Sequence, residues 1–156
     1  MQATARVEHR DYVPYNWVAV KFCRVEFHGK LAGEMKKKWR KAENELINQS
    51  KNRYQMKLNK VLDLRREADE ILKEVKSGKP FYRFWYNEAE RKRVAKARKL
   101  HERAEKIEAS AKEYPTAYET YRCVEKFLQQ EGFVLMHTES RGKECITKTE
   151  LWKLEW

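Results

Sequence analysis

Residues 34–76 read EMKKKWRKAENELINQSKNRYQMKLNKVLDLRREADEILKEVK, and this stretch contains neither glycine nor proline. Apolar residues recur in it at steps of three and four, from Met35 through Tyr54 to Val75. These steps are the period of a helix that packs along one stripe, as in a coiled coil. Residues 77–80, Ser-Gly-Lys-Pro, then supply a glycine that ends a helix and a proline that begins another. We therefore predict one long helix over residues 34–76.

A second helix is predicted over residues 81–112, because alanine and apolar residues again recur at steps of three and four. With only four residues between them, the two helices must run antiparallel. A turn centred at residues 78–79 sets Lys57 level with Leu100. The two helices then form a hairpin over residues 34–113.

Strand patterns lie before and after this hairpin. Residues 17–27 are rich in β-branched and aromatic types, and residues 133–138 and 144–156 also have strand character. A third helix is predicted over residues 116–131, where apolar residues form one stripe and a glycine follows. The predicted order of elements is β-α-α-α-β-β.

The sequence therefore predicts an α+β fold in a single domain, residues 1–156. A long antiparallel helical hairpin, coiled-coil-like, would project from a small three-stranded sheet backed by one further helix. Residues 12–33 and 114–156 would form this platform, with the N-terminal strand joined to the C-terminal pair of strands.

Composition indicates a folded protein that is not embedded in a membrane. The 156 residues are 38% charged, yet 41% are hydrophobic and 12% aromatic, which is too many for a disordered chain. No apolar run approaches membrane-spanning length, and the first fifteen residues lack a signal-peptide core. The three cysteines are odd in number and far apart, which is typical of reduced thiols. We expect a cytoplasmic protein that is not secreted and has no membrane partner.

Positive charge is concentrated in two stretches of the chain. The net charge is +11, and residues 30–60 and 91–103 alone carry +7 and +6. On each predicted helix, cations recur at helical spacing along one flank of the apolar seam. In the predicted register the two flanks merge into one surface with cations on both sides of the seam, where like charges repel. The sequence predicts nucleic-acid contact through eight residues: Arg53, Lys57, Lys60, Lys92, Lys96, Lys99, Arg103 and Lys106.

Another basic cluster, residues 36–41, lies where the first helix should meet the sheet. Met35 and Trp39 are expected to pack inward, which leaves five cations in solvent. We interpret this cluster as a solubilising collar rather than a binding patch.

Five aromatic residues crowd into residues 81–86, directly after the predicted turn. A helix spreads them around its axis, so one seam cannot bury them all. Phe81, Phe84 and Trp85 are therefore candidates for a protein contact, or for a platform on which bases stack. The alternative is a tip that is capped by its own aromatic rings.

The sequence contains no motif for catalysis, metal binding or a cofactor. Its four histidines are scattered without metal-ligand spacing, and phosphate-binding and nucleophile motifs are absent. We predict a non-enzymatic protein that binds the DNA or RNA backbone, or a nucleoprotein complex, and no small-molecule substrate. The alternatives are a phage-type protein inhibitor of a nucleoprotein complex, such as an anti-CRISPR-like antagonist, and a self-assembling coiled-coil protein.

Overall fold

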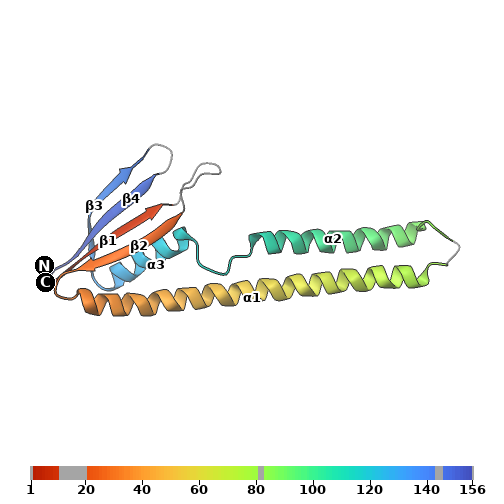
Figure 1. The fold of residues 1–156 in the computed structure, drawn as a ribbon, viewed down its shortest axis with the longest axis horizontal. Helices are drawn as coiled ribbons and strands as arrows, with labels where there is room; N and C mark the ends of the chain where they lie inside the picture. The colour runs from red at the N-terminus through yellow and green to blue at the C-terminus, as the bar shows by residue number, and fades with distance from the viewer. Residues whose placement is uncertain (1, 11–20, 81–82, 143–145, 156) are drawn as a thin grey trace. The chain divides into compact units, whose positions relative to one another are not determined.

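The structure is a computed structural model of the chain, and it describes residues 2–10, 21–80, 83–142 and 146–155. Its elements are β1 (Ala3–Arg10), β2 (Phe22–His28), α1 (Ala32–Gly78), α2 (Glu88–Ser110), α3 (Ala117–Gln130), β3 (Val134–Arg141) and β4 (Thr147–Leu154) (Figure 1). The chain divides into two compact units. We call residues 1–50 with 114–156 the sheet unit, and residues 51–113 the hairpin unit. Helix α1 contributes to both.

The sheet unit contains one antiparallel sheet in the order β2-β1-β4-β3 (Figure 1). Strand β1 lies at its centre, where Val7 pairs with Val25 on one side and with Glu150 on the other. The α+β class is confirmed, and so are three helices. The prediction of three strands in the order β-α-α-α-β-β is wrong, because β1 comes first and separates β2 from the C-terminal pair.

Strand β1 was not predicted because its inward-facing residues are small or polar. Ala3, Ala5 and Val7 are fully buried and His9 is 4% exposed, and they alternate with polar or charged residues on the other face. The alternation has a period of two, but it lacks the bulky apolar residues by which strands are usually recognised. Residues 17–20 of the predicted N-terminal strand lie outside the described residues, and β2 begins at Phe22.

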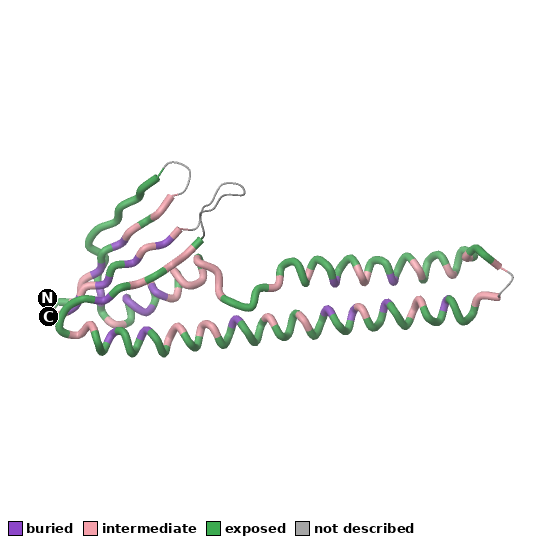
Figure 2. The backbone as a smooth tube through the Cα atoms, in the orientation of Figure 1, coloured by how far each residue is buried: buried purple, intermediate pink, exposed green. Residues whose placement is uncertain are grey.

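The core of the sheet unit lies between the sheet, α3 and the first turns of α1 (Figure 2). Helix α3 packs mainly against β1 and β2 and buries Val124, Phe127 and Leu128. Met35 and Trp39 of α1 are buried in the same core, as predicted, and the Trp39 ring lies 5.5 Å from the ring of Phe127. The cations of residues 36–41 are exposed.

Helix α2 begins later than the sequence predicts. The side chain of Asn87 accepts a hydrogen bond from the Glu90 backbone at 2.8 Å, and the Glu90 carboxylate accepts one from the Asn87 backbone at 3.1 Å. This reciprocal capping satisfies two backbone donors at a helix start. It outweighs the preference of Pro80 for a first helical position, so the start predicted at residue 81 is wrong. Residues 81–82 lie outside the described residues.

Three polar contacts between side chains show that α1 and α2 run antiparallel in the hairpin unit. They join Glu74 to Arg93, Asp69 to His101, and Arg65 to Glu108. Facing positions therefore have residue numbers that add to about 170. Lys57 lies beyond the end of α2, at Ser110, and not level with Leu100. The predicted register is wrong because residues 79–87, and not four residues, connect the helices.

Apolar residues fill the space between the two helices of the hairpin. Val61 and Leu64 of α1 pack with Ala104 of α2, and Leu100 and Ile107 flank them. Ala104 is fully buried in this cluster. These contacts occupy part of the apolar stripe of each helix.

The two registers can be distinguished by crosslinking. We expect cysteines at Asp69 and His101 to be joined within one chain by a short bis-maleimide, with the three native cysteines replaced by alanine. Cysteines at Lys57 and Leu100 should not be joined, because thirteen residues of offset correspond to about 20 Å along a helix. Efficient crosslinking of the second pair alone would show that the connection is short.

Candidate functional sites

Most of the net positive charge belongs to the hairpin unit. Residues 51–113 contain 19 Lys and Arg against 11 Asp and Glu, a net of +8 out of +11 for the chain. The sheet unit carries the remaining +3. The hairpin unit therefore carries most of the charge that would attract an anionic partner.

One face of the hairpin carries the predicted cations of both helices. Arg53, Lys60 and Glu74 lie at multiples of seven residues on α1, so they share one flank. Arg65 and Asp69, on the other flank of α1, contact Glu108 and His101, which lie on the flank of α2 opposite to Lys96. The cations of the two helices therefore lie on the same side of the seam.

The eight predicted residues follow one another along this face instead of lying side by side. We call them the basic row; from the tip end of the hairpin they are Lys92, Lys96, Lys99, Arg103 and Lys106 on α2, then Lys60, Lys57 and Arg53 on α1. Because the numbers of facing residues add to about 170, each residue of α1 can be placed level with a position of α2. On this basis the row spans about 35 Å, at 1.5 Å per residue. The prediction that the two stripes overlap is wrong, since the register differs.

The basic row is exposed, and most of its residues form no ion pair with a described residue. Six residues form no ion pair with any residue that the structure describes: Lys57, Lys60, Lys96, Lys99, Arg103 and Lys106. Lys92 lies 3.9 Å from Glu88, with both side chains in solvent. Across the seam from the α2 cations, α1 carries Glu67 and Glu74. The prediction of cations on both sides of the seam is therefore wrong for this part of the hairpin.

The loop at the tip of the hairpin presents two aromatic side chains to solvent. Phe84 is 87% exposed and Trp85 is 60% exposed. The loop is held by an ion pair between Arg83 and Glu90, whose side chains are largely buried. Phe84 and Trp85 therefore do not cap the tip, whereas Phe81 lies outside the described residues.

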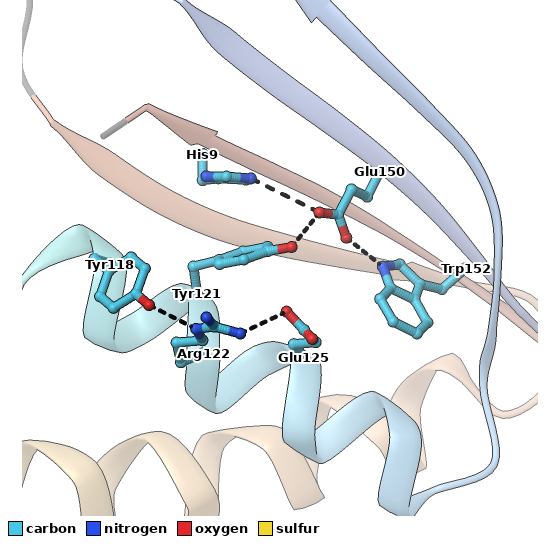
Figure 3. Close-up of polar contacts among 7 residues, drawn as sticks. All are labelled: His9, Tyr118, Tyr121, Arg122, Glu125, Glu150 and Trp152. Atoms are coloured by element: carbon cyan, nitrogen blue, oxygen red, sulfur yellow. Dashed lines mark hydrogen bonds and ion pairs between the residues drawn. The ribbon is translucent and has the colours of Figure 1, made fainter. Parts of the chain in front are cut away.

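The sheet unit contains a buried polar cluster that the sequence analysis missed (Figure 3). The Glu150 carboxylate accepts hydrogen bonds from the Tyr121 hydroxyl and, at 3.0 Å, from the Trp152 indole. Nε2 of His9 lies 3.8 Å from the same carboxylate, and the His9 ring stacks on Tyr121 with centroids 3.9 Å apart. These residues come from β1, α3 and β4. Only the tertiary fold brings them together, so no local pattern could reveal them.

The cluster holds Glu150 in its charged form. Burial by itself raises the pKa of the carboxyl, but the contacts from His9, Tyr121 and Trp152 outweigh burial and hold this pKa below its usual value of 4.5. Burial also raises the pKa of Tyr121, and Glu150 and Glu125 raise it further. The cluster therefore contains an anion and a neutral phenol at neutral pH.

Replacing Glu150 by glutamine tests this cluster. The change puts an N–H donor where a charged oxygen accepts a hydrogen bond, so we expect the free energy of unfolding at pH 7 to fall by about 1–3 kcal/mol. Because the folded-state pKa is lowered, the contribution of the carboxylate is present above pH 4.5 and is lost as the pH falls through that lowered pKa. Urea unfolding should show a smaller difference between the two proteins in acid. Equal stability at pH 7 would contradict this assignment; Glu26→Gln, at an exposed site, is the control.

No group of three or more His, Cys, Asp and Glu side chains in the described part of the chain is placed to hold a metal ion. None of the helices described combines the length and apolarity needed to cross a membrane.

Comparison with known proteins gives no match: no family model matches the chain, and no curated protein or solved structure does either.

Proposed function

We propose that this protein binds the phosphate backbone of DNA or RNA through the basic row of its hairpin, without catalysing a reaction. The single observation that carries the proposal is the row itself, in which six of eight cations form no ion pair with any described residue. The partner is free nucleic acid or nucleic acid in a nucleoprotein complex. The proposal places the protein inside the cell, where such partners occur.

Counterion release supplies the driving force for this binding. Nucleic acid carries closely spaced phosphates and condensed counterions, and each cation that neutralises a phosphate releases one. Lysine side chains that are exposed and not engaged with carboxylates are available for such contacts without first breaking an ion pair. Arg65 and Arg93, by contrast, contact Glu108 and Glu74 between the helices and stabilise the hairpin instead.

The row fits the sugar-phosphate backbone better than base edges. Six of its eight members are lysines, which act as point charges, whereas bidentate recognition of guanine is favoured by arginine. At about 35 Å, the row is as long as ten base pairs of B-form duplex at 3.4 Å per pair. We therefore propose binding that does not depend on sequence, with no cofactor and no small-molecule substrate.

Charge reversal at the row tests the proposal. In the row variant, Lys57, Lys60, Lys96 and Lys99 are changed to Glu. We expect the row variant to lose four phosphate contacts. At 0.1 M salt, their electrostatic contribution corresponds to about a 10³-fold change in affinity, so the variant should bind a mixed-sequence duplex more weakly by this factor. Fluorescence anisotropy with a labelled duplex measures this loss.

The collar provides a matched control. Lys36, Lys37, Arg40 and Lys41 are also exposed and form no ion pair with a described residue, so reversing them changes the net charge equally. Lys38 is left unchanged because it pairs with Glu131 at 3.1 Å. The collar variant should retain most of the affinity. If both variants lose affinity to the same degree, bulk charge and not the row determines binding.

A second candidate function is a protein contact through the tip, as in the antagonist of a nucleoprotein complex considered above. The observation that favours it is the exposure of Phe84 and Trp85 on a loop held by Arg83 and Glu90. Tryptophan is enriched among the residues that contribute most to binding between proteins.

Changing Phe84 and Trp85 to Ser tests this second function. Because both rings are exposed, we expect the melting temperature to change by less than about 2 °C, while the host proteins captured by the intact protein are lost. Treatment with nuclease before capture separates direct partners from those held through nucleic acid. A large fall in melting temperature would show that the two rings stabilise the fold.

A further inference from the structure

Strand β3 is an edge of the sheet, and all eight of its residues are exposed. Among them, Val134, Leu135 and Met136 are 62%, 44% and 52% exposed. No strand in the described residues pairs with the outer side of β3. An edge strand presents unpaired backbone N–H and C=O groups, and these groups are a template for one more strand.

A groove runs along the inner face of the sheet beside this edge. Gly132, with a φ of +91°, ends α3 and turns the chain directly into β3, so the end of α3 lies next to the start of the strand. Helix α3 packs mainly on β1 and β2, which leaves an open space of about 400 Å³ toward β3. The groove is lined by Tyr121, Glu125 and Gln129 of α3, by Phe133, Val134 and Leu135, and by Glu150 and Trp152 of β4.

The sheet register shows which residues of β3 face this groove. Leu135 pairs with Trp152 and Thr138 pairs with Glu150, and directly paired residues point to the same face of a sheet. Leu135 and Thr138 therefore face α3. A strand added beside β3 would likewise direct every second side chain into the groove.

The chemistry of the lining favours a cation. Its two charged residues, Glu125 and Glu150, are both acidic, although the chain contains 35 Lys and Arg against 24 Asp and Glu. Three aromatic residues, Tyr121, Phe133 and Trp152, lie in the same lining. Glu150 is buried, and its carboxylate already accepts hydrogen bonds from Tyr121 and Trp152. Glu125, whose side chain is partly exposed, is therefore the carboxylate that an entering ammonium or guanidinium group would meet beside the aromatic rings. Figure 3 shows Glu125 on α3, on the same side of the helix as Tyr121, where its carboxylate lies 3.9 Å from Arg122.

We propose that the edge of β3 binds an extended segment of another protein, which adds a fifth strand to the sheet and inserts a lysine or arginine side chain into the groove. Backbone hydrogen bonds to β3 hold the segment, and the groove selects its side chain. The exposed apolar residues at the start of β3 favour an apolar neighbour beside the cation. Pairing with β3 of a second copy of this chain would supply no cation, because the β3 residues on the groove side, Leu135, Thr138 and Ser140, are uncharged.

The test uses the full chain and a synthetic peptide, acetyl-Thr-Val-Thr-Lys-Thr-Val-Thr-amide. We expect titration calorimetry to detect binding and amide hydrogen exchange to slow in β3. The same peptide with norleucine in place of lysine should bind about tenfold more weakly, and with glutamate weaker still. Equal binding of the three peptides would overturn the cation site, and unchanged exchange in β3 would overturn the added strand.

Two neighbouring residues of α3 provide matched variants. Gln129 and Gln130 are both exposed, but only Gln129 lines this groove. Gln129→Lys places a positive charge in the groove and should weaken binding of the lysine peptide at least tenfold. Gln130→Lys adds the same charge elsewhere and should bind as the unchanged protein does. Equal affinities of the two variants would overturn the location of the site.

Discussion

The side chain of Glu90 joins the tip loop to the first turn of α2, and the geometry of the hairpin depends on it. Its carboxylate accepts a hydrogen bond from the Asn87 backbone and pairs with Arg83. This arrangement begins α2 at Glu88 and lengthens the connection from α1. The longer connection sets the register, in which Glu74 contacts Arg93 and the cations of α1 lie beyond those of α2. One local capping arrangement thus gives a single row of about 35 Å instead of two shorter, mutually repelling stripes.

The two units use charge in different ways. In the hairpin unit, cations and anions that meet at the seam pair with each other, while the basic row has cations that remain available. In the sheet unit, Glu150 is buried, and its carboxylate accepts hydrogen bonds from Tyr121 and Trp152, with Nε2 of His9 3.8 Å away. The same carboxylate, together with Glu125, makes the groove beside β3 acidic in an otherwise basic protein. We therefore propose different partners for the basic row and for this groove.

The sequence predicted the elements that have a strong local signal. Helix α1 was predicted to within two residues at each end, because 43 residues without glycine or proline and with helical spacing allow few alternatives. Strand β1 was missed since alanine and histidine fill its inner face. The register was missed because the capping pair, Asn87 and Glu90, competes with Pro80 for the same helix start. The cluster around Glu150 joins positions far apart in sequence, so it depends on the tertiary fold alone.

The claim that the basic row binds phosphates is tested most directly by the salt dependence of binding to a mixed-sequence duplex. For eight contacts, a plot of the logarithm of the association constant against the logarithm of salt concentration should have a slope of about −7. A slope of about −5 or steeper would show that most residues of the row contact phosphates. The slope should be the same for unrelated sequences of equal length. A slope between 0 and −2, or no binding at low salt, would contradict the account.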